Sequence, residues 1–197
     1  MSIFENNNDY YNEEYKDIKF PNNLEECNFH NNRFINVDFS DVNLSSLYFE
    51  KCYFIGCRFN GCTFPIYVTK DNYYEACNMM GVSFSELSFK NTEFNDCKMN
   101  YCSFSSSSLQ NVSFIKCSLE ETNFIDLKKI VKVIFDECNL KKADFMQTSL
   151  NNIDFRTCNI SGISVNVNDL KGLIVTSVQA ADIALVLGIQ VKEIGDE

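Results

Sequence analysis

Residues 24–64, LEECNFHNNRFINVDFSDVNLSSLYFEKCYFIGCRFNGCTF, decide the fold of this chain because an apolar residue returns at every fifth position. The returning residues are Leu24, Phe29, Phe34, Phe39, Leu44, Phe49, Phe54, Phe59 and Phe64. Neither the helical period of about 3.6 residues nor the alternation of a flat strand fits this spacing. A fixed period that holds over so many copies is the signature of a repeat architecture, in which each short unit is buried only against its neighbours.

The same rhythm continues in two further runs, so one repeat domain takes up most of the 197 residues. The first run is Met79, Phe84, Phe89, Phe94, Met99, Phe104, Leu109, Phe114, Leu119 and Phe124, and the second is Phe135, Leu140, Phe145, Leu150, Phe155, Ile160, Val165 and Leu170. Every phenylalanine except Phe4 and Phe20 falls on the rhythm. We therefore expect these side chains to form one long core.

The ten cysteines obey the same spacing, because each lies two residues before a repeat position: Cys27, Cys52, Cys57, Cys62, Cys77, Cys97, Cys102, Cys117, Cys138 and Cys158. Other occupants of this position are small or β-branched, such as Val42, Thr92 and Ala143, which indicates that cysteine fills space in the core. No CxxC pair occurs, and the polar start Met-Ser-Ile-Phe-Glu-Asn contains no apolar signal stretch. We expect buried free thiols, no metal site, and a reducing, cytoplasmic location.

Two inward positions in every five residues describe a chain that turns a corner once per pentapeptide. Four such sides close a coil of about twenty residues. Ala143-Asp144-Phe145-Met146-Gln147 and Cys138-Asn139-Leu140-Lys141-Lys142 resemble the A(D/N)LXX motif of pentapeptide-repeat proteins. The resemblance covers residues 24–172. It implies an all-β fold, a right-handed quadrilateral β-helix, which we expect over residues 15–172.

The first interruption of the rhythm, residues 65–76, reads PIYVTKDNYYEA. Two interpretations stay open, namely three degenerate pentapeptides or a loop that projects from the rod. The proline and the three tyrosines favour the loop, because exposed aromatic residues are common binding anchors. The candidate partner-binding residues of this loop are Pro65, Ile66, Tyr67, Lys70, Asp71, Tyr73 and Tyr74.

The second interruption, residues 125–134, adds one residue to the spacing between Phe124 and Phe135. A single extra residue predicts a bulge that lets the coil continue with Ile130 on a repeat position. Lys128, Lys129 and Lys132 make this segment locally basic. A solvated bulge is the first interpretation, and a contact for a phosphate or an acidic partner is the second.

The two ends of the chain do not follow the repeat. Residues 1–14 are rich in Asn, Glu and Tyr and are predicted to be disordered. In the tail, residues 173–197, Thr176 and Gln179 have the spacing of a capping box, and Gly188 is suited to end the helix. The helix is apolar on nearly every side, so we expect it to cover the rod with one face and a second copy with another; the alternative is a helix that only caps its own rod. The candidate dimerisation residues are Ala180, Ile183, Ala184, Leu185, Leu187 and Ile189.

The tail also indicates which group of pentapeptide-repeat proteins the chain resembles. Asp169-Leu170-Lys171-Gly172, Gln179-Ala180 and Leu187-Gly188-Ile189 look like the carboxyl-terminal segment of the Qnr-type and mycobacterial fluoroquinolone-resistance pentapeptide proteins. The resemblance implies a dimeric rod that mimics B-form DNA and binds a type II topoisomerase, DNA gyrase or topoisomerase IV. It further implies protection of that enzyme from quinolones or poisoning toxins, and projecting loops that contribute to protection, of which residues 65–76 are the counterpart by position.

The chain carries a net charge of −10, yet the rod itself is nearly balanced between acids and bases. Duplex DNA carries one negative charge per ~1.7 Å, so the rod imitates it electrostatically only if its acids gather on one face. The candidate acidic face consists of Asp38, Asp41, Glu93, Asp96, Glu120 and Glu121. An acidic protein repels phosphate, so direct binding of nucleic acid is not expected.

Catalysis is not expected either. His30 is the only histidine, follows a repeat residue and should face solvent, so no nucleophile–base pair can be assembled. No phosphate-binding glycine loop and no apolar stretch long enough for a membrane are present. The sequence therefore predicts a non-enzymatic protein without cofactors that protects a topoisomerase. The alternative is a scaffold that docks another cytoplasmic protein.

Overall fold

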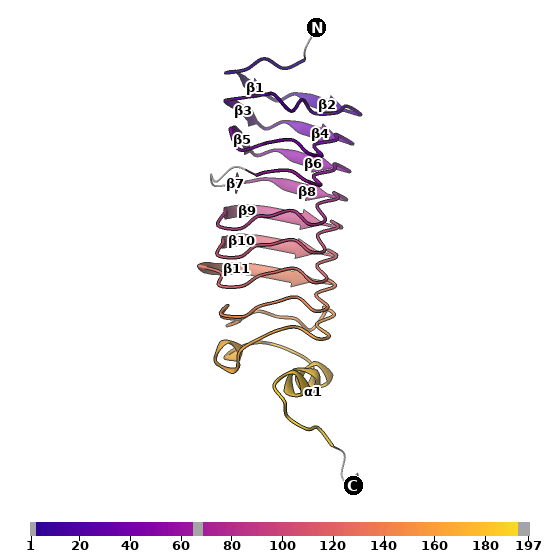
Figure 1. Cartoon of the computed structure of the whole chain (residues 1–197), viewed down its shortest axis with the longest axis vertical. Helices are drawn as coiled ribbons and strands as arrows, with labels where there is room; N and C mark the ends of the chain where they lie inside the picture. The colour runs from indigo at the N-terminus through magenta and orange to yellow at the C-terminus, as the bar shows by residue number, and fades with distance from the viewer. Residues whose placement is uncertain (1–2, 65–68, 193–197) are drawn as a thin grey trace.

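The computed structural model, which describes residues 3–64 and 69–192, is a rod of stacked coils that ends in one short helix (Figure 1). Its strands are β1 (Asp9–Tyr11), β2 (Glu14–Lys16), β3 (Cys27–His30), β4 (Arg33–Ile35), β5 (Leu47–Glu50), β6 (Tyr53–Ile55), β7 (Thr69–Lys70), β8 (Tyr73–Glu75), β9 (Ser88–Asn95), β10 (Ser108–Ile115) and β11 (Lys129–Asp136). A 3-10 helix, Val167–Leu170, and helix α1, Ser177–Val186, follow. The predicted quadrilateral β-helix with a carboxyl-terminal helix is confirmed.

Two adjacent walls of the rod are parallel β-ladders. Wall A contains β1, β3, β5 and β7, wall B contains β2, β4, β6 and β8, and β9, β10 and β11 each run across both walls. Repeat residues of successive coils lie opposite each other, as Phe29 and Phe49 do on wall A. The other two walls are built from tight turns, such as the one in which the Val42 N–H donates to the Phe39 carbonyl at 3.1 Å. The five-residue period therefore arises because each pentapeptide forms one wall.

Left-handed backbone at the corners explains why asparagine and aspartate are common there. Asn31, Asp71, Asn91 and Asn111 have φ between 49° and 57° in one corner column. This conformation costs roughly 1–2 kcal/mol for most residues, and the short polar side chains of Asn and Asp reduce that cost by local hydrogen bonding. The Asn91 amide donates to Asp71 at 2.6 Å, and the Asn111 amide donates to Asn91 at 2.9 Å. Each corner is thus tied to the next coil.

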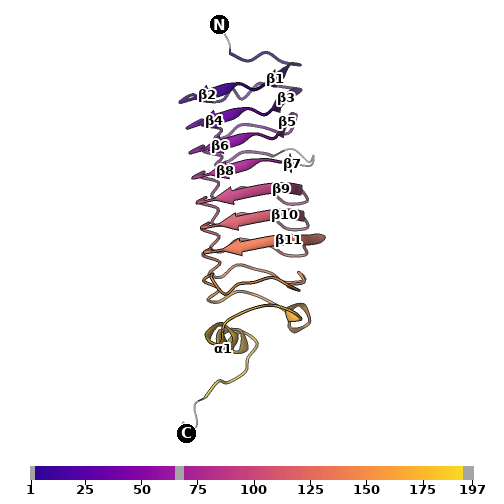
Figure 2. The ribbon, with the colours of Figure 1, turned by 180° about the vertical axis from the view of Figure 1, so that it is seen from behind.

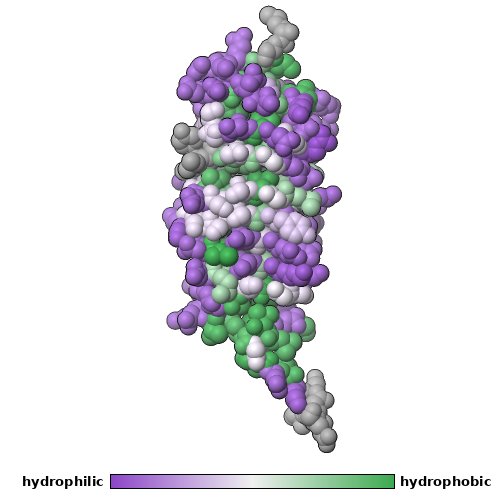
Figure 3. All heavy atoms as spheres, viewed as in Figure 1, coloured by the Kyte–Doolittle hydropathy of each residue, from purple (hydrophilic) through white to green (hydrophobic). Residues whose placement is uncertain are grey.

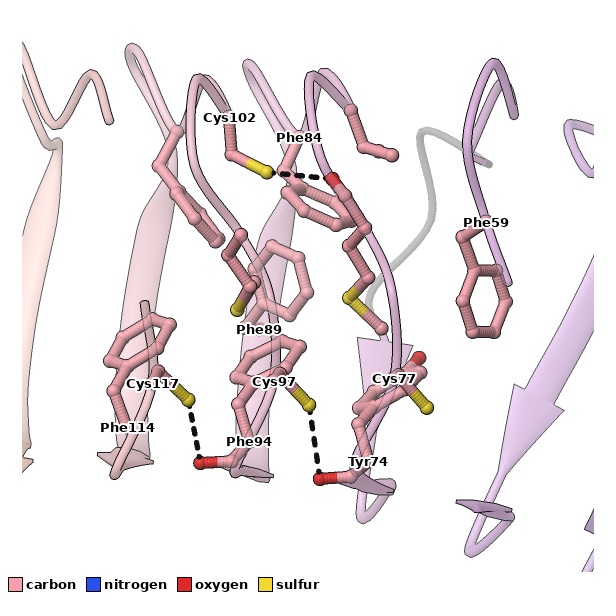
Figure 4. Close-up of a cluster of buried hydrophobic side chains, with 14 of the residues drawn as sticks. Phe59, Tyr74, Cys77, Phe84, Phe89, Phe94, Cys97, Cys102, Phe114 and Cys117 are labelled. Carbon is pink, nitrogen blue, oxygen red and sulfur yellow. Dashed lines mark hydrogen bonds between the residues drawn. The ribbon is translucent and has the colours of Figure 1, made fainter. Parts of the chain in front are cut away.

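The core is a set of phenylalanine stacks along the rod axis. Phe94 lies between Tyr74, at 5.0 Å between ring centroids, and Phe114, at 5.1 Å, with the rings nearly parallel (Figure 4). Neighbouring stacks meet edge to face, as Phe104 meets Phe114 at 5.7 Å. Offset stacked and edge-to-face pairs are both favourable, so the rings hold the coils in register.

All ten cysteines are buried, as the repeat predicts. In Figure 4 Cys97 and Cys117 occupy equivalent places in neighbouring coils, and their thiols donate to the carbonyls of Tyr74 and Phe94 at 3.5 and 3.3 Å. Burial raises the pKa of the Cys52 and Cys102 thiols to about 12, so they stay protonated at neutral pH. These cysteines therefore act as small core residues that also bridge adjacent coils.

The structure differs from the expectation that residues 1–14 are disordered. The part that it describes, residues 3–14, contains β1 and the start of β2 and belongs to the first coil. Tyr15 stacks on Phe34 at 5.2 Å, Phe20 lies 4.7 Å from Phe39, and Phe4 covers the end of the core. The prediction failed because the first coil is out of phase with the repeat. Its Tyr10 lies opposite Phe29, nineteen residues later, whereas Phe29 lies opposite Phe49, twenty residues later.

The prediction of a projecting loop is wrong for residues 69–76, while Pro65, Ile66 and Tyr67 lie outside the described residues. β7 and β8 pair with the coils on both sides, and Tyr74 is buried 4.8 Å from Phe54. Asn72 fits the core because its side chain accepts from the Cys52 N–H at 2.9 Å and donates to the Phe49 carbonyl at 2.9 Å. These residues are degenerate pentapeptides.

The extra residue at 125–134 does not interrupt the ladder. β11 pairs with β10 along its whole length, with Ile130 opposite Leu109, so the predicted repeat position of Ile130 is confirmed. Ile130 is only partly buried, in contrast to Leu109. Below β11 the described chain contains no further strand, as Figures 1 and 2 show.

Candidate partner-binding surfaces

A column of outward side chains on wall B places two tyrosines next to each other on the surface. This tyrosine strip consists of Arg33, Tyr53, Tyr73 and Glu93, contributed by β4, β6, β8 and β9 at equivalent positions. The Arg33 guanidinium lies 5.6 Å from the centre of the Tyr53 ring, and Tyr53 and Tyr73 are 6.0 Å apart. Asn95 donates to the Tyr73 hydroxyl at 3.3 Å. The strip is a rigid aromatic surface with one charge at each end, and a cavity of about 350 Å³ lies beside it.

Lys70 and Asp71, which the sequence placed on a loop, belong to a charged network on wall A. Lys70 bonds Glu50 at 2.9 Å and lies 3.5 Å from Asp71, while Glu50 also contacts His30 at 3.3 Å. The hydrogen bond from Lys70 lowers the pKa of Glu50. Because one lysine lies between two carboxylates, the pairing reduces the negative charge of this part of the surface without cancelling it.

The candidate acidic residues do not gather into one continuous face. Asp38 stands in a column with Arg58 and Lys98, and it pairs with Arg58 at 2.8 Å. Glu120 and Glu121 pair with Lys141 and Lys142 of the next coil at 3.3 and 3.0 Å. Glu93 ends the tyrosine strip, Asp96 lies at the corner after wall B, and Asp41 lies at another corner, beside Gly61. Basic residues therefore interrupt the negative surface.

Helix α1 closes the carboxyl-terminal end of the rod. The predicted capping box is present, with the Thr176 N–H donating to Gln179 at 2.9 Å and the Gln179 N–H donating to Thr176 at 3.3 Å. The Gln179 amide also donates to the carbonyls of Phe155 and Cys158 at 2.8 and 2.9 Å. These bonds satisfy carbonyls that would otherwise meet a further coil. The helix ends as predicted at Gly188, whose φ of 80° is left-handed.

Only one side of α1 is used by the rod. Ile183 is buried and Leu187 packs against the core, whereas Leu185 and Ile189 are 57% and 56% exposed. Ala180 is exposed as well, and Ala184 is partly buried. Of the predicted dimerisation residues, Ile183 and Leu187 therefore face the rod, and the others lie on or beside the open side. Apolar side chains gather at this end of the molecule in Figure 3.

Sequence reasoning missed several residues of these surfaces, among them Arg33, Tyr53, Val178 and Val186. Tyr53 belongs to the tyrosine strip, and its position twenty residues before Tyr73 is a signal that alignment of the coils would have shown. Val178 and Val186 are 72% and 43% exposed on α1, and both belong to the apolar helix that the sequence predicts. The described residues contain no cluster of three or more His, Cys, Asp or Glu side chains arranged to hold a metal ion. They also contain no helix with the length and apolarity needed to span a membrane.

Comparison with solved structures returns proteins of low sequence identity. The full-length plasmid-mediated fluoroquinolone resistance protein QnrB1 aligns over 92% of this chain and 100% of its own, with 16% identity and a TM-score of 0.44. HetL, a pentapeptide repeat protein involved in heterocyst differentiation regulation from the cyanobacterium Nostoc, aligns over 87% of this chain and 91% of its own, with 11% identity and a TM-score of 0.33. Comparison with curated protein sequences gives no match.

Family models match the repeat itself. A model described as pentapeptide repeat region matches residues 69–130, and one described as pentapeptide repeats (8 copies) matches residues 23–64 and 132–162. Together they cover more than half of the chain, including the degenerate segment that begins at Thr69. The chain therefore belongs to the pentapeptide-repeat family.

Proposed function

We propose that this chain is a non-enzymatic homodimer that binds a type II topoisomerase, DNA gyrase or topoisomerase IV, and protects it from quinolones or poisoning toxins. The observation that carries the proposal is the tail. Its sequence resembles that of the topoisomerase-protecting members, and in this chain it forms a capped helix with one side on the rod and an open apolar side. A repeat that only needed an end cap would require one apolar side.

Dimerisation follows from the exposed side of α1. Val178, Leu185, Val186 and Ile189 lie on or next to one short helix, and all are more than two-fifths exposed. A two-fold axis through this region would place the same patch of each copy against the other, which is the commonest way for a soluble protein to cover such a surface. The dimer would then be a rod of twice the length.

The tyrosine strip is the surface on which we place the enzyme contact. Tyrosine and arginine are over-represented among residues that dominate binding energy, and here ladder pairing on both sides holds them rigidly. Because Asp38, Glu120 and Glu121 are paired with bases, imitation of DNA by charge contributes less to this proposal than the shape of the rod.

The test is a supercoiling assay with gyrase and ciprofloxacin, with and without the protein. We expect the protein to restore supercoiling in the presence of the drug. The double variant Tyr53→Ala/Tyr73→Ala should need a roughly tenfold higher concentration for the same restoration. Tyr101→Ala is the matched control, because Tyr101 is 57% exposed and lies outside the strip. No rescue together with no gyrase binding at micromolar concentrations would reject the topoisomerase proposal and leave the alternative, a scaffold for another protein.

A further inference from the structure

The lower edge of β11, the edge that faces the carboxyl-terminal end of the rod, has no strand partner. β9 and β10 are each paired on both sides, but β11 pairs only with β10. No backbone hydrogen bond joins Lys129–Asp136 to residues 149–156 of the next coil within the described chain. Peptide groups along a strand edge that lack partners are able to pair with another extended chain.

The backbone of the next coil explains the free edge. In that coil the Ile153 N–H donates to the Leu150 carbonyl at 3.1 Å, and the Cys158 N–H donates to the Phe155 carbonyl at 2.9 Å. Both segments are therefore tight turns, whereas the coils above are extended on the same two walls. Tight turns do not present the regular row of donors and acceptors that a parallel strand requires. The ladder of walls A and B consequently ends at β11.

The space beneath β11 is a recess bounded at both ends. The Leu127 N–H donates to the Thr148 hydroxyl at 3.0 Å, and the Glu137 N–H donates to the Thr157 hydroxyl at 3.1 Å, so two threonine side chains fix the ends. Between them lie two adjoining cavities of about 580 and 460 Å³, which share Val133 and Asn152. We call this space the β11 recess. Its length is that of one eight-residue strand.

The two halves of the recess differ in charge, because lysines line the first cavity whereas Asp136, Asp154 and Arg156 line the second, where Asp154 pairs with Arg156 at 2.7 Å. Lys128, Lys129 and Lys132 line the first cavity, on a chain whose net charge is −10. Lys129 donates to Gln110 at 3.1 Å, and Lys132 makes no ion pair among the described residues. Val131 and Ile134, 39% and 57% exposed, add apolar surface along the strand.

We propose that the β11 recess binds an extended acidic segment of a partner protein, which adds a strand to β11. Its backbone would pair with the free edge, its carboxylates would lie near Lys129 and Lys132, and its apolar side chains would contact Val131 and Ile134. Strand addition of this kind takes affinity from main-chain hydrogen bonds and specificity from alternate side chains. The lysines favour an acidic partner over a second copy, because two β11 edges brought together would oppose lysine to lysine. The proposal stands whether or not the partner of the tyrosine strip is a topoisomerase.

The probe for this proposal is a fluorescent decapeptide that alternates Glu and Val, with the full-length protein as receptor. We expect its anisotropy to rise on binding, and we expect the corresponding Lys-Val decapeptide to bind at least about tenfold more weakly. Two further Glu-Val peptides carry N-methyl groups on alternate amides, one on the odd and one on the even positions. Only one edge of the peptide strand faces β11, so one methylated peptide should lose binding and the other should retain it.

Substitutions in the protein distinguish binding at the β11 recess from nonspecific attraction of an acidic peptide to surface lysines. Lys132→Glu and Ile134→Glu should each weaken binding of the Glu-Val peptide roughly fivefold. Lys98→Glu is the control, because Lys98 is exposed on another wall of the rod, and it should leave the affinity for the peptide unchanged. Unchanged circular dichroism and unfolding midpoints would show that the variants fold. Equal binding of both methylated peptides, or equal weakening by Lys98→Glu, would overturn strand addition at β11. So would a sedimentation result in which Ile134→Glu dissociates a dimer of the chain, since a second copy would then be the occupant.

Discussion

The central coils and the carboxyl-terminal end of the rod contain similar apolar residues but use them in opposite ways. In the central coils, rings such as Phe94 and Phe114 are fully buried, and the strands around them pair with the coils on both sides. At the end of the rod, Leu185 and Ile134 are each 57% exposed, and β11 has a free edge. The strands of a central coil pair with strands above and below, whereas β11 lies above a coil of tight turns and α1 has no coil beneath it. The end of the repeat is therefore where the chain has surface left for another molecule.

The largest effect that this comparison predicts is in the central core. Phe94→Ala removes a ring that stacks on both Tyr74 and Phe114, and the cavity should lower the free energy of unfolding by roughly 3–5 kcal/mol. Denaturant titration followed by circular dichroism measures the change. Leu185→Ala is the matched control, because its side chain is exposed and its removal should change monomer stability by less than about 0.5 kcal/mol. Equal losses in the two variants would show that the end of the rod is packed as tightly as its centre.

How much of the fold could be predicted follows from the same comparison. The repeat predicted the core because the same two inward positions recur in every coil. An unusual residue in one coil therefore does not hide the pattern that the other coils show. The prediction failed where single substitutions were read in isolation. Asn72 seemed incompatible with the core, yet Asn32 occupies the same position inside the regular run, and its side chain likewise accepts from Glu13 and donates to Tyr10. That comparison would have indicated a coil at residues 69–76.

The surfaces were less predictable because they depend on the stacking of coils. Tyr73 was predicted as a contact residue, but only the register of β6 and β8 places Tyr53 beside it. The apolar helix was visible in the tail, yet which of its residues face the rod depends on how Gln179 docks on Phe155 and Cys158. The free edge of β11 arises from a change of backbone conformation at Leu150–Ile153 that residue types alone do not reveal.

The second prediction addresses the open side of α1. Leu185→Glu places a charge at the centre of the proposed dimer contact, where burying it unpaired should weaken association by about 2 kcal/mol or more. Sedimentation velocity should then show monomers at a concentration at which the unmodified chain is dimeric, with the circular dichroism spectrum unchanged. Lys171→Glu, an exposed change before the helix, serves as a control that should preserve the dimer. A dimer that persists in Leu185→Glu would place the interface elsewhere on the rod.

The third prediction concerns the junction between rod and helix. Gln179→Ala removes one half of the capping box and the side-chain donor to the Phe155 and Cys158 carbonyls, of which the Phe155 carbonyl keeps the Cys158 N–H as a donor. The free energy of unfolding should fall by about 1–2 kcal/mol, and amide protons of α1 should exchange faster with solvent. Gln179→Glu is the informative companion, since it keeps the acceptor for the Thr176 N–H but cannot donate to the two carbonyls. If Gln179→Glu lowers the free energy of unfolding as much as Gln179→Ala does, the effect comes from the hydrogen bonds to Phe155 and Cys158 rather than from the capping box.

The smallest predicted effect is electrostatic and measures how much an ion pair between two coils contributes to the free energy of unfolding. The hydrogen bond from Arg58 lowers the pKa of Asp38 to about 2, so the pair stabilises the fold above the usual aspartate pKa and loses that contribution as the pH falls through 2. Because the Arg58 side chain is 62% exposed, Arg58→Ala should cost less than about 1 kcal/mol near neutral pH. The difference between the two proteins should shrink as the pH falls from about 5 to 2 and should also shrink in high salt, as measured by urea unfolding at each condition. A difference that is independent of both pH and salt would mean that Arg58 stabilises the wall by packing its aliphatic stem, and that the charges contribute nothing measurable.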